Sequence, residues 1–123
     1  MSSTPDIVNW WLAKWKKGKT GSDLIMGIRH IKCIDGFTMS VQASQYMYCE
    51  PRVDVGPWRA VEVGFPSMRV EEFMKYAEDR GDPTQTVYNR VPVAVVNKVI
   101  QDHGGIDTTF MRAISRIETN DPA

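Results

Sequence analysis

Apolar residues recur along this chain in two rhythms, one typical of helices and one typical of strands. Four of them stand at helical spacing near the N-terminus: Ile7, Trp11, Leu12 and Trp15. This spacing predicts an amphipathic helix within residues 1–18. Residues 28–65 instead alternate between apolar and polar positions, which is the two-residue period of half-buried strands. The pair Asp35-Gly36 inside this region indicates a hairpin turn.

The alternating region predicts strands, and the residues after it predict helices. The expected strands are 28–34, 37–43 with a continuation through 45–49, and 59–65. Val70, Phe73, Met74 and Ala77 predict one amphipathic helix, and Pro92 opens another. We therefore expect an α+β fold: an antiparallel β-sheet followed by C-terminal helices, with an extra N-terminal amphipathic helix. The chain would form a single domain, 1–123, mainly β over 28–65 and mainly helical over 69–104.

The net charge, the hydropathy and the number of cysteines exclude several classes of partner and of protein. Fifteen basic residues balance fifteen acidic ones, so overall charge does not draw the chain to DNA, RNA or an anionic membrane. No apolar run approaches the roughly 20 residues that span a bilayer, and no secretory leader is recognisable. Cys33 and Cys49 are too few for a disulfide framework, and both thiols are expected to be free.

The residues that could catalyse a reaction do not form a recognisable catalytic arrangement in the sequence. The potential zinc ligands are scattered: His30, Cys33, Cys49 and His103. No basic histidine stands near Cys49 to activate it, and no glycine-rich phosphate loop occurs. We expect a binding protein without metal or cofactor rather than an enzyme. A hydrolase that uses Glu62, Glu78 and Asp79 as its acids is the weaker alternative.

The residues that suit a planar, phosphate-bearing ligand gather at predicted strand ends and before the last helix. Arg52 follows Tyr46 and Tyr48, and Arg90 stands beside Asn89 just before a helix N-terminus. One guanidinium group can donate two parallel hydrogen bonds to a phosphate, and helix N-termini favour anions. Asn89 offers a donor and an acceptor to a base edge, and Tyr48 offers an aromatic face. The sequence therefore predicts a ligand-binding domain.

Several strings in the chain together resemble one family of phage proteins. They are SVQAS at 40–44, YCEPR at 48–52, VEVGFPS at 61–67, YAED at 76–79, TVY at 86–88, VPV at 91–93 and HGG at 103–105. Over residues 36–105 the chain is similar to the type I Thoeris anti-defence sponge proteins. The resemblance implies a homodimer or a trimer of dimers that works in the cytoplasm of the infected bacterial host. It would sequester cyclic ADP-ribose isomers, which are immune signalling nucleotides, without cleaving them.

The resemblance also implies roles for individual residues. Arg52 and Asn89 match the kinds of residue that the family would place on the ligand, and Phe73 and Tyr76 could supply aromatic stacking. Some members of the family bind cyclic oligonucleotides at a second nucleotide site. Here that site would involve a segment after the HGG string, with Thr108, Thr109 and Arg112. Ile106 stands where a phosphate-binding arginine would be expected, which departs from the pattern.

A different function is suggested by the tryptophans of the N-terminal helix. Trp10, Trp11 and Trp15 stand close together, and tryptophan is enriched in the residues that dominate protein–protein binding. The alternative hypothesis is therefore a phage inhibitor that binds a host defence protein directly through its Trp-rich helix.

Overall fold

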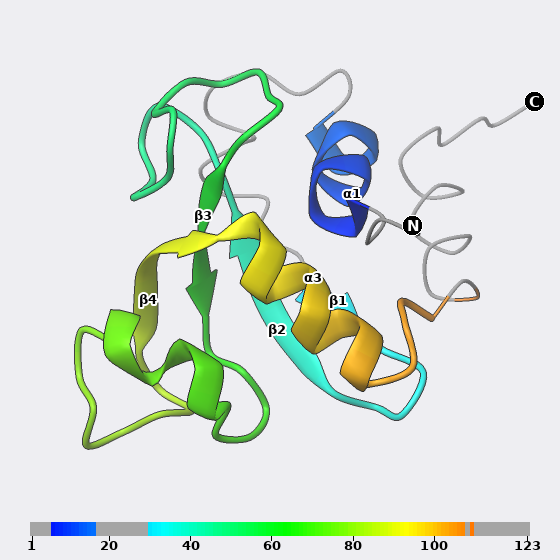
Figure 1. The fold of residues 1–123 in the computed structure, drawn as a ribbon, viewed down its shortest axis with the longest axis vertical. Helices are drawn as coiled ribbons and strands as arrows, with labels where there is room; N and C mark the ends of the chain where they lie inside the picture. The colour runs from blue at the N-terminus through cyan, green and yellow to red at the C-terminus, as the bar shows by residue number, and fades with distance from the viewer. Residues whose placement is uncertain (1–5, 17–29, 108, 110–123) are drawn as a thin grey trace, which may run out of the picture.

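Four antiparallel strands form one sheet, and their order in the sheet is their order in the chain (Figure 1). The computed structural model describes residues 6–16, 30–107 and 109. The strands are β1 (His30–Lys32), β2 (Thr38–Gln42), β3 (Ala60–Gly64) and β4 (Val87–Pro92). Together with the helices described below, this sheet confirms the predicted α+β fold. The Asp35-Gly36 hairpin is also confirmed, since Ile31 pairs with Met39 across it and Gly36 takes a positive φ of 98°.

Two α-helices lie side by side in front of this sheet, α1 (Ile7–Lys16) and α3 (Val93–Asp102) (Figure 1). The backbone N–H of Val8 donates to Asn97 Oδ1 at 2.9 Å, which joins the two helices. The core combines the apolar face of α1 with that of α3 and with alternate positions of the strands. Its fully buried members include Val8, Trp11, Leu12, Met39, Val41, Val61, Val63, Val96 and Ile100. No helix in the described part of the chain is both long and apolar enough to cross a membrane.

The segment that spaces Val70, Phe73, Met74 and Ala77 forms a short 3₁₀ helix, η1 (Glu71–Tyr76), instead of an α-helix. Phe73 is fully buried, and its ring packs against that of Tyr88 with the ring centroids 5.7 Å apart. Ala77 then pairs with Tyr88 in an isolated β-bridge. Helical spacing was therefore a correct guide to the buried side of this segment, although pairing with the sheet edge ends the helix after six residues.

The predicted strand 45–49 is wrong, because these residues belong to a long loop between β2 and β3. Side chains in the loop capture the backbone groups that a strand would have used. Gln45 donates to Asp54 twice, from its backbone N–H at 2.9 Å and from Nε2 at 2.8 Å. The backbone N–H of Tyr46 donates to Ser44 Oγ at 3.0 Å. Such local side-chain bonds compete with a β-ladder.

The pairing of β3 with β4 contains an irregularity that shapes the site described next. Val61 pairs with Val91, but Val63 pairs with Tyr88, so β4 has an additional residue in this stretch. Arg90 lies within the bulge at a positive φ of 50°. A bulge redirects side chains relative to a regular strand. Pro92 was expected to open the last helix, whereas β4 extends to Pro92 and α3 begins at Val93.

Candidate functional site

The loop between β2 and β3 meets the β4 bulge at three of the predicted ligand-binding residues. The guanidinium carbons of Arg52 and Arg90 lie 5.3 and 5.6 Å from the centroid of the Tyr48 ring. These distances are those of cation–π contacts. The Tyr48 residue is 42% exposed, and both arginines are exposed. We call Tyr48, Arg52 and Arg90 the arginine–tyrosine cluster.

Backbone and thiol bonds hold this cluster in place. The Arg90 backbone N–H donates to the carbonyl of Tyr48 at 3.0 Å, which attaches the bulge to the loop. The buried Cys49 thiol donates to the carbonyl of Ser44 at 3.2 Å and lies 3.3 Å from that of Pro51. Cys49 is therefore a structural residue of the loop, and both cysteines are free and buried. These bonds fix the backbone that carries Tyr48 and Arg90, which would reduce the entropy cost of binding a ligand there.

The two guanidinium groups differ in how far they are already engaged by carboxylates. Glu50 contacts Arg90, with Oε2 3.6 Å from Nε, and Arg59, with Oε1 3.4 Å from Nη2. All three side chains are about half exposed or more, so these ion pairs are weak. Arg52 has no carboxylate oxygen within 4.0 Å among the described residues. Arg52 can thus accept an anionic ligand directly, whereas Arg90 would exchange Glu50 for one.

Hydrogen-bond acceptors lie beside the cluster, on the sheet and at its edge. Glu62 on β3 is half-buried, and its pKa is raised, mainly by burial. The hydrogen bond from the Tyr48 backbone N–H lowers the pKa, the charge of Glu78 raises it and the charge of Arg52 lowers it. Asn89 Nδ2 donates to Glu78 Oε2 at 3.0 Å. Asn89 Oδ1 is buried and has no hydrogen-bond partner. The donor half of the predicted Asn89 contact is therefore engaged within the protein, and the acceptor half is unsatisfied.

Sequence reasoning did not select Gln42, which shares features with this acceptor group. Gln42 pairs in register with Glu62. Its Nε2 donates to Ser40 Oγ at 3.0 Å, and its Oε1 is buried without a hydrogen-bond partner, like Asn89 Oδ1. The signal was present in the sequence, because Gln42 and Glu62 are the polar members of alternating strands. Unsatisfied buried acceptors are uncommon in native proteins, which makes this row of strand residues notable.

The other predicted site residues do not join the cluster. Phe73 is fully buried in the core, so its assignment as a ligand-stacking residue is corrected: its ring packs on Tyr88. Tyr76 is half-buried, with the Lys75 ammonium 5.4 Å from its ring centroid. Thr108 and Arg112 lie outside the described residues. The backbone N–H of Thr109 donates to Asp107 Oδ1 at 2.9 Å.

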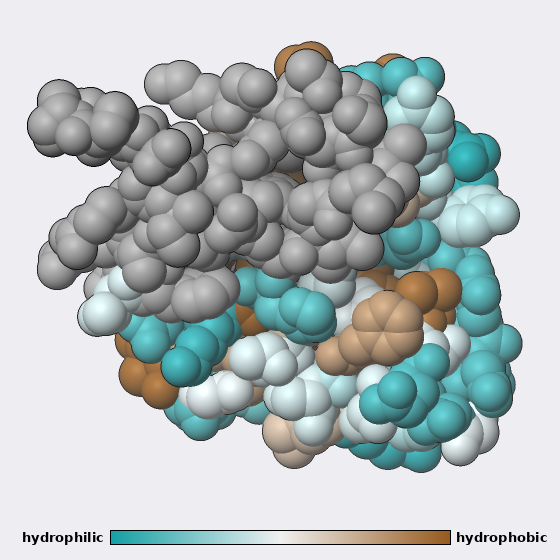
Figure 2. Space-filling model, turned by 180° about the vertical axis from the view of Figure 1, so that it is seen from behind, coloured by the Kyte–Doolittle hydropathy of each residue, from teal (hydrophilic) through white to brown (hydrophobic). Residues whose placement is uncertain are grey.

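The tryptophans of α1 differ in their burial. Trp11 is fully buried in the core, whereas Trp10 is 47% exposed; the Trp15 side chain lies outside what the structure describes. Under the alternative hypothesis of direct inhibition, Trp11 therefore cannot contact a host protein, whereas Trp10 can. From behind, apolar residues lie scattered among hydrophilic ones over the described surface (Figure 2).

The arrangement suits binding of a planar anion. An exposed ring can stack on a base, two guanidinium groups can pair with phosphates, and nearby acceptors can receive hydrogen bonds from a ligand.

Comparisons with protein-family models, curated proteins and solved structures find no match to this chain.

Proposed function

We propose that this protein binds a cyclic ADP-ribose-type signalling nucleotide and sequesters it without cleavage. In this role it would be a phage anti-defence sponge in the cytoplasm of the infected bacterial host. The observation that carries the proposal is the arginine–tyrosine cluster, in which Arg52 and Arg90 flank an exposed aromatic ring. The family resemblance over residues 36–105 supplies the identity of the ligand.

The chemistry of the ligand matches the chemistry of the cluster. A cyclic ADP-ribose carries an adenine base and a pyrophosphate with two negative charges. The base would stack on Tyr48, and the pyrophosphate would pair with Arg52 and displace Glu50 from Arg90. The neutral overall charge of the chain is compatible with this ligand, since a small anion needs only a local basic site. On the basis of the resemblance, we also propose that the chain assembles as a homodimer or a trimer of dimers and has a second nucleotide site.

The test is capture of the signal followed by release. Purified protein is incubated with a lysate of cells that produce the signal, washed and heated, and the released molecules are analysed by mass spectrometry. The expected result is an intact cyclic ADP-ribose isomer. Recovery of linear ADP-ribose, with turnover at substoichiometric protein, would refute sequestration and favour the hydrolase reading, in which Glu62 is the candidate acid. An empty protein would refute nucleotide binding.

Site variants test whether the cluster holds the ligand. Arg52→Gln and Arg90→Gln should each weaken binding about tenfold or more, because charge-assisted hydrogen bonds contribute about 1.5–3 kcal/mol. Tyr48→Ala should weaken it similarly, since base stacking contributes about 1–3 kcal/mol. Arg69→Gln is the matched control, because Arg69 is exposed and pairs with Glu71 at 2.7 Å outside the cluster. Unchanged binding in the first three variants would place the ligand elsewhere.

The alternative, direct inhibition of a host defence protein, is favoured by one observation, the exposure of Trp10. Trp10→Ala should abolish anti-defence activity under this alternative and leave nucleotide capture intact. Under the sponge proposal the same variant keeps its activity.

A further inference from the structure

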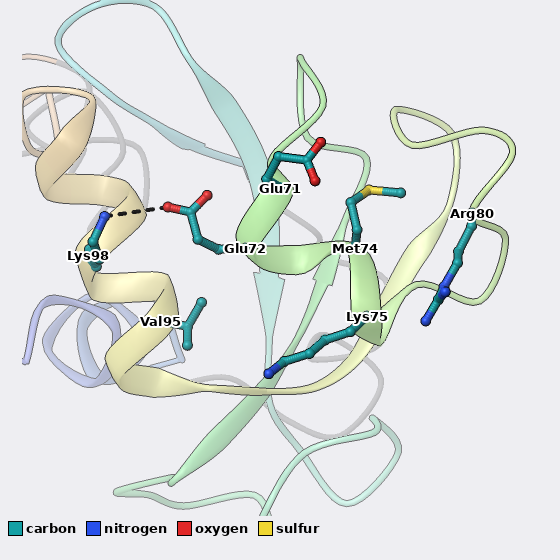
Figure 3. A pocket seen from close by; sticks show the side chains of 7 residues that line it. All are labelled: Glu71, Glu72, Met74, Lys75, Arg80, Val95 and Lys98. Atoms are coloured by element: carbon teal, nitrogen blue, oxygen red, sulfur yellow. Dashed lines mark hydrogen bonds and ion pairs between the residues drawn. The ribbon is translucent and has the colours of Figure 1, made fainter.

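A groove of about 550 Å³ runs over η1 and reaches α3, on elements that contribute nothing to the arginine–tyrosine cluster (Figure 3). Its apolar lining comes from Met74 on η1 and Val95 on α3, both half-buried. Charged side chains surround this apolar part. The volume is within the range of small-molecule sites, which run from roughly 300 to 1,000 Å³.

Three of the charged groups around the groove already have ion-pair partners. Lys98 Nζ lies 3.4 Å from Glu72 Oε2 and 2.8 Å from Asp102 Oδ2. These carboxylates raise the pKa of Lys98, the Asp102 hydrogen bond most, so the ammonium stays charged and engaged. Glu71 pairs with Arg69, which is not part of the groove lining; Arg69 Nε lies 2.7 Å from Glu71 Oε1.

Two cations remain without a carboxylate partner. Among the described residues, no carboxylate oxygen lies within 4.0 Å of Lys75 Nζ or of the Arg80 guanidinium, and both side chains are exposed and line the groove. Figure 3 shows Lys75 extending from η1 toward α3, where Val95 points into the same space. Arg80 stands on the loop that follows η1, on the other side of that helix (Figure 3). The groove thus combines an apolar lining with two cations that have no carboxylate partner among the described residues.

We propose that this groove is a second ligand site, which binds a small organic anion with an apolar body. The body would pack on Met74 and Val95, and its acidic groups would pair with Lys75 and Arg80. A phosphate monoester suits this set, because the guanidinium fork of Arg80 matches phosphate oxygens and the ammonium of Lys75 attracts them. A neutral apolar molecule would leave both cations uncompensated, and an inorganic anion would leave the apolar lining uncovered. The ligand must therefore carry both features.

The probe is 1-naphthyl phosphate, with 1-naphthol as its uncharged counterpart. Binding is measured by calorimetry on the full chain, and the site is located by methyl NMR signals of Met74 and Val95. We expect 1-naphthyl phosphate to shift these two signals and to bind at least tenfold more tightly than 1-naphthol. The double variant Lys75→Gln/Arg80→Gln should lose at least tenfold in affinity, because each lost ion contact is charge-assisted. Both substitutions are at exposed positions, so the fold should be retained, which circular dichroism checks.

A matched double variant distinguishes a local site from general attraction by positive charge. Lys32→Gln/Arg59→Gln removes the same two charges from exposed positions outside the groove and should bind the probe as the parent chain does. The proposal is overturned if both double variants weaken binding equally, or if Lys75→Gln/Arg80→Gln changes affinity less than threefold. Equal affinity for 1-naphthol, or signal shifts confined to residues away from the groove, would overturn it too. A planar phosphate can also bind at the arginine–tyrosine cluster, so the methyl signals of Met74 and Val95, rather than the total heat, decide whether the groove is occupied, whether or not the nucleotide proposal holds.

Discussion

Asn9 on α1 holds the loop that carries the arginine–tyrosine cluster, and its replacement by alanine should destabilise the protein measurably. The Asn9 side chain bonds both backbone groups of Trp58: Nδ2 donates to the carbonyl at 2.9 Å, and Oδ1 accepts from the N–H at 2.8 Å. Trp58 itself is 5% exposed, and its indole N–H donates to the carbonyl of Val53 at 3.0 Å. One side chain therefore connects α1 to the end of the loop.

The expected magnitude follows from these two bonds. Each neutral hydrogen bond contributes about 1 kcal/mol net, and a shielded backbone group left without a partner costs about a further 1 kcal/mol. Alanine offsets about 0.6 kcal/mol of this loss through its better helix propensity. Because water can reach part of the site, the net loss should be about 2 kcal/mol of the free energy of unfolding.

Urea denaturation followed by tryptophan fluorescence measures this loss. Ala13→Ser is the matched control, because Ala13 is exposed on the same helix; it should change stability by less than about 0.5 kcal/mol. Asn9→Ala should also weaken nucleotide binding, although Asn9 is not a cluster residue, because the loop that carries Tyr48 and Arg52 loses its brace. A change in stability as small as that of the control would refute the reasoning.

Three further predictions concern pH and backbone strain. The pKa of Asp35 is lowered, first by the hydrogen bond from the Phe37 N–H and then by His103. The ionised carboxylate therefore stabilises the fold above pH about 4, and this stabilisation is lost as the pH falls through the lowered pKa. In urea titrations between pH 7 and pH 3, the free energy of unfolding of Asp35→Asn should fall less with decreasing pH than that of the parent. Burial raises the pKa of Glu62, so its contribution is complete below pH about 4.3 and declines as the pH rises; the stability of Glu62→Gln relative to the parent should therefore increase from pH 4 to pH 7, and a constant difference would contradict this. Arg90→Gly should leave stability unchanged or raise it by about 1 kcal/mol, because glycine tolerates a positive φ, while nucleotide capture is lost; retained capture would remove Arg90 from the site.

The sheet could be predicted from the sequence because alternation and turn chemistry agreed there. The run 37–43 contains β2, the run 59–65 contains β3, and Asp35-Gly36 forms the hairpin. The run 45–49 alternates equally well and is still a loop. This run is a loop because the carboxylate of Asp54, nine residues further along the chain, accepts hydrogen bonds from both the backbone N–H and the side-chain amide of Gln45. A local pattern does not reveal a competitor that folding brings in from elsewhere.

The candidate ligand-binding residues could be selected from the sequence by residue type, but the sequence did not show which of them are exposed. Tyr48 and Phe73 were both candidates for stacking, yet one is exposed and the other fully buried. An aromatic residue at helical spacing is compatible with a core or a binding role, and only packing against Tyr88 decides for Phe73. The uncompensated charges of Lys75 and Arg80 were also not foreseeable, because the partners of neighbouring charges depend on how η1 faces α3.

Arg90 connects the strained backbone of the bulge to the chemistry of the site. Its N–H bonds the carbonyl of Tyr48, and its guanidinium lies over the ring of the same tyrosine, so both ends of Arg90 attach to one residue. A positive φ at a non-glycine residue costs about 1–3 kcal/mol, and such strain concentrates at functional sites. Glycine would satisfy the backbone at this position more easily, but it would remove the guanidinium. The presence of arginine where the backbone favours glycine therefore supports our proposal that a ligand binds at the arginine–tyrosine cluster.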